Sequence, residues 1–97
     1  MFGVISKFPL GKIVMTRGVN NEIADNVSFS KFVLNSLKRH AQCDWGSLGK
    51  EDTASNDSAL KDGGRLFSAY IEEGLKKIWI ITEWDRSVTT VLFPDEY

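Results

Sequence analysis

Residues 77–97, KIWIITEWDRSVTTVLFPDEY, hold the densest run of β-branched and aromatic residues in the chain and decide its fold. Residues 77–83 and 87–93 predict two strands, because apolar side chains occupy the middle of both alternating faces in each segment. The polar residues 84–86 between them have the length and character of a hairpin loop. Pro94 has no backbone N–H to donate and ends the second strand. We therefore expect this hairpin to lie at the centre of a sheet.

Two further segments alternate in the same way. Residues 65–72 (RLFSAYIE) predict a strand directly before the hairpin, so that the last three strands form a meander. Residues 12–17 (KIVMTR) predict another strand near the start of the chain, ended by Gly18. Asn20 and Asn21 follow, and these residue types are typical of a loop.

Residues 29–41 predict the main helix. Its apolar side chains recur at the spacing of one helical stripe, which we expect to pack on the sheet: Phe29, Phe32, Val33 and Leu37. Ser28 is the predicted N-cap, because its hydroxyl can accept a bond from an otherwise unpaired backbone N–H. Val27 and Phe32 stand at the spacing of a hydrophobic staple. The basic residues 38–40 fall in the last turn, where positive charge favours the exposed carbonyls.

The middle of the chain is less apolar. Residues 50–62 predict a short second helix that ends at Gly63. Trp45, in the glycine-rich connector before it, is large and apolar and is expected to be buried. The fold class that follows is α+β, with one main amphipathic helix and a short second helix packed on a mainly antiparallel sheet of about four strands.

Length and composition narrow the class of protein further. Ninety-seven residues are expected to form a single domain, Met1–Tyr97. The net charge of −1 provides no general basic field for nucleic acid. One cysteine, Cys43, cannot form an internal disulfide, which favours a reducing compartment. No apolar run is long enough to span a membrane, and residues 1–11 predict an irregular lead-in rather than a secretory signal. We expect a cytoplasmic protein with no membrane partner.

Metal and thiol chemistry are both disfavoured. His40 and Cys43 are the only histidine and cysteine, whereas structural zinc needs four ligands. We therefore expect no metal site and no cofactor. A Cys43 nucleophile with His40 as its base would lack a third group to orient that base. The glycine-rich phosphate-binding patterns G-x-x-x-x-G-K and G-x-G-x-x-G are both missing from the sequence.

One catalytic alternative stays open. A metal-independent ribonuclease needs a general acid or base and cations that stabilise the developing phosphorane charge. His40 with Arg65 or Arg86 offers those groups, and barnase and RelE use such groups on a similar helix-and-sheet architecture. The wider polar set is Arg39, His40, Arg65, Glu83, Arg86, Thr89 and Thr90. The opposing interpretation is structural, with His40 capping the helix and the arginines pairing with carboxylates.

The tryptophans suggest a different use of the surface. Trp79 lies inside a predicted strand and is expected in the core. Trp84 lies in the charged turn and is the best candidate for exposure. Aromatic and arginine side chains are enriched at interaction hot spots. Trp84, Asp85 and Arg86 are therefore the predicted contacts of a protein partner.

Three stretches carry a resemblance to a known family: residues 39–48 (RHAQCDWGSL), 65–70 (RLFSAY) and 77–97. They resemble small bacterial proteins of plasmids, prophages and other mobile elements, some labelled plasmid-related protein or type I restriction endonuclease subunit M. The shared pattern is R-H-x-x-G-D-W-G, then D…N…A-L, then R-L-x-S-x-Y, then W-I-I-T-E-x-D-R-S-x-T-T-x-L-F-P-x-E-Y. Cys43 stands where the family usually has glycine. The family has no established catalytic residues, so the resemblance assigns none to this chain.

What the resemblance implies is a biological context. Small proteins of mobile elements often antagonise host defence by binding an effector, as anti-CRISPR and anti-restriction proteins do. The resemblance therefore implies a non-enzymatic protein-binding module that inhibits a host defence nuclease complex. The metal-independent ribonuclease, with nucleic acid as its partner, is the alternative. A DNA-binding regulator is disfavoured, because the sequence has no basic stripe and no helix-turn-helix pair.

Overall fold

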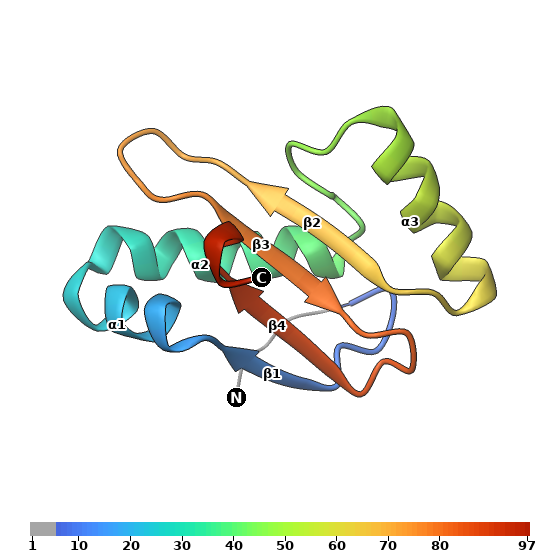
Figure 1. Cartoon of the computed structure of the whole chain (residues 1–97), viewed down its shortest axis with the longest axis horizontal. Coiled ribbons are helices and arrows are strands. Elements are labelled where there is room, and N and C mark those ends of the chain that lie inside the picture. The colour runs from blue at the N-terminus through green and yellow to red at the C-terminus, as the bar shows by residue number, and fades with distance from the viewer. Residues whose placement is uncertain (1–5) are drawn as a thin grey trace.

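The computed structural model describes residues 6–97 and has a four-stranded sheet in the order β1-β4-β3-β2 (Figure 1). The strands β2, β3 and β4 form an antiparallel meander, and β1 pairs in parallel with β4. The predicted central hairpin and the predicted α+β class are therefore confirmed. The bounds are β1 (Lys12–Met15), β2 (Leu66–Tyr70), β3 (Ile78–Thr82) and β4 (Val88–Leu92). Of the predicted irregular lead-in, residues 1–5 lie outside the described residues, and residues 6–11 contain no helix or strand.

The described residues form three α-helices and one short 3-10 helix. Figure 1 shows α1 and α2 on one side of the sheet, while α3 lies beside the edge strand β2. Both predicted helices are confirmed, and α1 is additional. Within residues 6–97 no helix combines the length and the apolar character that crossing a membrane would require. The bounds are α1 (Arg17–Asp25), α2 (Val27–Ala41), α3 (Lys50–Asp62) and the 3-10 helix η1 (Pro94–Glu96).

The helix α1 replaces the predicted loop at Asn20 and Asn21, and that prediction was wrong. The helix begins because the Thr16 hydroxyl accepts a bond from the Val19 N–H at 3.4 Å. The carboxylate of Glu96, far away in sequence, accepts a second bond from the Gly18 N–H at 3.1 Å. Burial of Val19 then outweighs the weak helix propensity of the asparagines, since packing overrides propensity. The preceding strand consequently stops at Met15.

The start of α2 also differs from the prediction. Asn26 is the N-cap, and its side-chain oxygen accepts a bond from the Phe29 N–H at 3.1 Å. The predicted cap Ser28 lies inside the helix, and the predicted staple is wrong because Val27 is 72% exposed. An asparagine caps a helix as well as a serine does, so the sequence offered two good candidates. The predicted apolar stripe is confirmed, because Phe29 and the three other members are buried.

The buried apolar residues form two clusters. The larger lies between α2 and the sheet and includes Phe29, Leu37, Ile78, Ile80 and Val91. The smaller one joins the connector and α3 to the sheet, and its buried members are Phe8, Trp45, Ala59 and Leu66. The expected burial of Trp45 is confirmed. The helix α3 contributes few apolar side chains, so its attachment depends on polar contacts with β2 as well.

The outer edge of β2 is closed by hydrogen bonds. The amide of Asn56 on α3 donates to the Phe67 carbonyl at 2.7 Å and accepts from the Phe67 N–H at 3.0 Å. Two positions further on, the Ala69 N–H donates to the Trp45 carbonyl, and the Ser47 N–H donates to the Ala69 carbonyl. Edge strands with unpaired backbone groups invite pairing with other chains. These contacts remove that possibility along the middle of β2.

We expect Asn56→Ala to lower the free energy of unfolding by about 2 kcal/mol, because it leaves the N–H and carbonyl of Phe67 without their buried partner. Urea unfolding measures this loss, and hydrogen exchange at the Phe67 amide should become faster. Ser55→Ala, at an exposed neighbouring position on α3, is the matched control and should change stability by less than about 0.5 kcal/mol. Equal effects of the two substitutions would contradict the role of Asn56.

Candidate functional site

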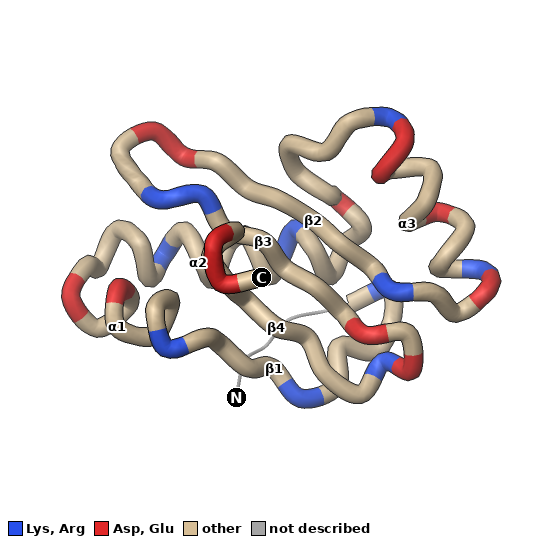
Figure 2. The backbone as a smooth tube through the Cα atoms, in the orientation of Figure 1, with Lys and Arg blue, Asp and Glu red and all other residues tan. Residues whose placement is uncertain are grey.

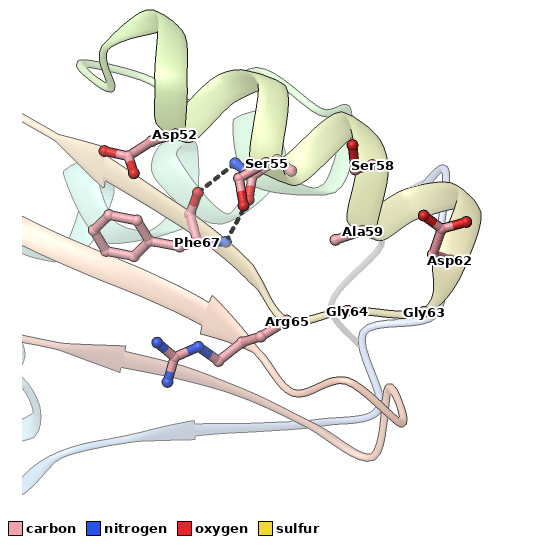
Figure 3. Close-up of a pocket in the computed structure, with 10 residues that line it drawn as sticks. Asp52, Ser55, Ser58, Ala59, Asp62, Gly63, Gly64, Arg65 and Phe67 are labelled. Atoms are coloured by element: carbon pink, nitrogen blue, oxygen red, sulfur yellow. Dashed lines mark hydrogen bonds between the residues drawn. The ribbon is translucent and has the colours of Figure 1, made fainter.

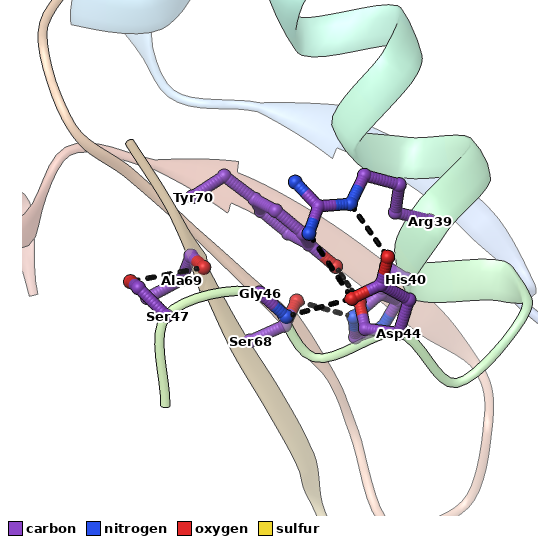
Figure 4. Close-up of polar contacts among 8 residues, drawn as sticks. All are labelled: Arg39, His40, Asp44, Gly46, Ser47, Ser68, Ala69 and Tyr70. Carbon is purple, nitrogen blue, oxygen red and sulfur yellow. Dashed lines mark hydrogen bonds and ion pairs between the residues drawn. The ribbon is translucent and has the colours of Figure 1, made fainter. Parts of the chain in front are cut away.

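Motif residues from the end of α2 and from β2 meet around Asp44 (Figure 4). Two guanidinium nitrogens of Arg39 donate to the two carboxylate oxygens of Asp44, at 2.7 and 3.1 Å. The Tyr70 hydroxyl donates to the Asp44 carbonyl at 2.7 Å, and the Arg39 guanidinium lies 5.0 Å from the centre of the Tyr70 ring. The bonds from Arg39 lower the pKa of Asp44, whereas burial raises the pKa of Tyr70. This cluster fixes the connector against the sheet.

The backbone of the connector is equally constrained. Gly46 has a φ of +75°, and a Cβ atom there would lie 1.9 Å from the Ala69 carbonyl oxygen, so only glycine fits. Cys43 has a φ of +64°, in the left-handed region that glycine adopts most easily. Its thiol is partly buried, and burial raises its pKa, which works against a reactive thiolate.

His40 is fully buried beneath the sheet. Its Nδ1 lies 2.6 Å from the Ser68 hydroxyl, and its Nε2 lies 2.9 Å from the Thr82 hydroxyl. The Thr82 hydroxyl lies 2.8 Å from that of Thr89, which donates to the Leu10 carbonyl at 2.7 Å. One chain of hydrogen bonds thus connects α2, three elements of the sheet and the segment before β1.

The direction of this chain identifies the tautomer of His40. A carbonyl can only accept, so the single hydroxyl hydrogen of Thr89 points to Leu10. Thr89 must then accept from Thr82, and Thr82 must accept from the Nε2–H of His40. The Nδ1 atom of a neutral imidazole is left to accept from Ser68. His40 is therefore assigned as the neutral Nε2–H tautomer, consistent with burial, which lowers its pKa to about 3.

The structure does not bring His40 and Arg65 into one site. His40 lies under the sheet face that carries Ser68 and Thr82. Arg65 lies on the opposite face, since side chains alternate along β2, and its guanidinium is 5.5 Å from the centre of the Tyr97 ring. A neutral imidazole with both nitrogens occupied, on the far side of a sheet from a cation, cannot share a scissile phosphate with it.

Arg86 has a structural position at the end of the β3–β4 turn. Its guanidinium donates to the carbonyls of Gly64 and Ala59, at 2.6 and 3.0 Å, and to two carbonyls of its own turn. These bonds tie the turn to the end of α3. The residue has a φ of +59°. The guanidinium is directed at these internal carbonyls rather than outward.

The three predicted partner contacts therefore differ in their environments. Trp84 is 67% exposed, as predicted. The Asp85 carboxylate accepts bonds from the hydroxyl and the N–H of Ser87, at 2.6 and 3.1 Å, which lower the Asp85 pKa. With Arg86 directed inward, Trp84 is the member of the trio whose side chain projects most freely from the turn.

Metal binding receives no support from the described residues. Within residues 6–97, no three histidine, cysteine or acidic side chains are grouped so that they could hold a metal ion. Both nitrogens of His40 are already bonded to hydroxyl groups. His40 and Cys43 are thus not arranged as a metal-ligand pair.

Sequence reasoning missed Glu96 and Tyr97, although both belong to the motif at the end of the chain. Glu96 accepts bonds from the Thr16 hydroxyl at 2.6 Å and from the N–H groups of Phe93 and Gly18. Burial opposes these bonds, but together they lower the pKa of Glu96. The ring of Tyr97 packs at 5.8 Å from that of Trp79. The signal available in the sequence was the motif at residues 77–97. Its ending, an acidic residue followed by an aromatic one, was the only indication of these contacts.

A hollow of about 200 Å³ lies on the face of the sheet opposite α2. Its lining is aromatic and aliphatic apart from one arginine: Arg65, Phe67, Trp79, Ile81 and Tyr97. It adjoins a groove of about 570 Å³ between α3 and β2, which shares Arg65 and Phe67 (Figure 3). We call the first of these the aromatic hollow. Unlike the residues around His40, its side chains face outward.

The fold and these contacts define an α+β domain whose polar motif residues bind one another and whose outer sheet face carries an aromatic hollow. Comparison of the chain with protein-family models, curated proteins and solved structures finds no match. Functional inference therefore depends on the geometry of the chain and on its motif residues.

Proposed function

We propose that this protein is a non-enzymatic protein-binding module that inhibits a host defence nuclease complex, of the kind targeted by anti-CRISPR or anti-restriction proteins. The observation that carries the binding role is the exposure of large aromatic side chains, with Trp84 and Tyr97 each 67% exposed. Large aromatic residues on a folded surface provide contact area at low cost in conformational entropy. They are not needed for the core, which is complete without them.

The positions of the polar residues favour binding over catalysis. His40, the one imidazole in the sequence, has both nitrogens occupied inside the protein. Burial keeps it neutral well below pH 7, so it is not a proton carrier near neutral pH. Arg86 is committed to backbone carbonyls of the fold. These positions support the binding proposal over the ribonuclease alternative.

The nature of the target comes from the resemblance. The motif stretches around Arg39, at β2 and along residues 77–97 are similar to those of proteins carried on mobile elements. Such elements gain from blocking the nucleases that would destroy them. A small protein that binds the nuclease complex does this without chemistry, in keeping with the contact surface described above.

The test is binding and inhibition with purified defence nucleases of the CRISPR and restriction types. We expect one complex to bind the protein and to lose DNA cleavage, and Trp84→Ala to weaken both by about tenfold. Val27→Ala, which removes another exposed apolar side chain, is the matched control and should bind normally. No binding to any complex, or RNA cleavage that His40→Ala abolishes, would overturn the proposal.

A further inference from the structure

The aromatic rings that line the hollow pack against one another. The Phe67 and Trp79 rings meet edge to face at 5.1 Å, and Trp79 meets Tyr97 at 5.8 Å. Tyr97 directly follows Glu96, whose three hydrogen bonds hold the end of the chain in place. A preformed apolar surface loses little entropy when it binds a ligand. The hollow, of about 200 Å³, suits one large apolar side chain.

Arg65 gives the hollow a charge. Its guanidinium lies over the Tyr97 ring, and within residues 6–97 it forms no ion pair and no hydrogen bond. The other two arginines with resolved contacts, Arg39 and Arg86, bind a carboxylate and carbonyls of the protein itself. A planar guanidinium with five unused donors matches a carboxylate in shape and charge. The other side chains of the lining are uncharged.

The neighbouring groove narrows the choice of ligand. It is lined by Asp52 and Asp62 on the α3 side, while Arg65 reaches away from α3 across the sheet (Figure 3). Figure 2 shows acidic positions recurring along α3, which carries four acidic residues and two lysines. A nucleic-acid backbone crossing the hollow would meet this acidic helix and be repelled. A single carboxylate placed in the hollow lies beside Arg65, the charged side chain of its lining.

We propose that the aromatic hollow is the docking site for a partner segment that places an aromatic or branched aliphatic side chain beside an aspartate or glutamate. The apolar side chain fills the hollow between Phe67, Trp79 and Tyr97, and the carboxylate pairs with Arg65. This inference rests on the proposed binding function and names the surface and the chemistry of its partner. Trp84 is not among the residues that line the hollow, and it contributes a second contact.

The test uses three hexapeptides that place Phe, Trp or Leu beside Glu, and the same three with Gln in place of Glu. Each is titrated into the protein while the indole N–H of Trp79 is followed by NMR. We expect saturable shifts with at least one Glu peptide and about tenfold weaker binding of its Gln counterpart. Arg65→Gln should abolish the preference for Glu, while Arg17→Gln, at another exposed arginine, should retain it.

Two further outcomes would overturn this inference. One is the lack of a Trp79 shift with every peptide, and the other is tighter saturation of the same signal by a hexanucleotide of single-stranded DNA or RNA. The proposed function is judged separately with the nuclease complex. If that complex binds wild type and Arg65→Gln equally, while Trp84→Ala still weakens binding, this inference fails and the proposed function stands.

Discussion

Lowering the pH from about 7 to about 5 is expected to reduce the free energy of unfolding by about 2 kcal/mol through His40 alone. The folded protein holds this imidazole neutral, with its pKa lowered by burial from 6.5 to about 3. The unfolded chain has no such constraint and binds the proton more readily across that interval. Protonation therefore favours the unfolded state as the pH falls.

The sign follows from the direction of the shift. The stability contributed by neutral His40 is fully present above the unfolded pKa and is lost as the pH falls toward the folded pKa. Over the whole interval the loss would be on the order of 4 to 5 kcal/mol. The carboxylates of Asp44, Asp85 and Glu96, whose pKa values are lowered, lose their contributions at lower pH. A range above about pH 5 keeps the two effects apart.

Urea unfolding at the two pH values measures this loss. His40→Gln is the informative variant, because it can still donate to Thr82 and accept from Ser68 but cannot titrate. We expect it to be less stable than wild type at neutral pH but nearly independent of pH in this range. Nitrogen NMR of wild type should find the proton of His40 on Nε2. A proton on Nδ1, or an equal pH dependence in both proteins, would contradict the assignment.

Arg86→Ala is expected to lower the free energy of unfolding by about 3 kcal/mol. The substitution removes the guanidinium that binds the carbonyls of Gly64 and Ala59, and with it the connection between the β3–β4 turn and α3. Hydrogen bonds from a charged donor each contribute about 1.5 to 3 kcal/mol, and those made by one side chain are not additive.

Two further variants serve as comparisons for Arg86→Ala. Arg86→Lys keeps the charge but loses the planar fork, so we expect it to recover less than half of the loss. Arg65→Ala removes an exposed arginine that binds no oxygen atom of residues 6–97, and it should cost less than about 1 kcal/mol. If Arg86→Ala unfolds at the same urea concentration as Arg65→Ala, the bonds to Gly64 and Ala59 do not stabilise the fold. Because Arg86→Ala is expected to destabilise the fold, the test of partner binding uses Trp84→Ala alone.

Periodic patterns made most of the fold predictable. Ile78, Ile80 and Thr82 alternate with Trp79 and Ile81, and this pattern exists because strand side chains alternate between faces. The stripe that includes Phe29 and Leu37 identified α2 in the same way. The helix α1 has only Val19 and Ile23 at helical spacing, too short a stripe to predict a helix through Asn20 and Asn21. Its start depends on Glu96, which no local pattern connects to Gly18.

The site was less predictable than the fold. The sequence identified His40, Arg65 and Arg86 as polar residues that could act together. Residue type alone does not show on which face of the sheet each side chain lies after α2 has packed against it. The exposure of Trp84 followed from its place in a short turn. The position of Tyr97 could not be predicted in this way, because it depends on a contact between its ring and that of Trp79 on another element.

By itself, the sequence determined the central hairpin, the buried face of α2 and the α+β class, because each follows from the periodic spacing of apolar side chains along one strand or helix. Only the tertiary structure decided that His40 is a buried, neutral member of a hydrogen-bond chain. It also decided that Arg65 lies beside an aromatic hollow and forms no ion pair with any residue of the described range 6–97. These properties arise between elements distant in sequence. Burial and hydrogen-bond partners of that kind exist only after the chain has packed.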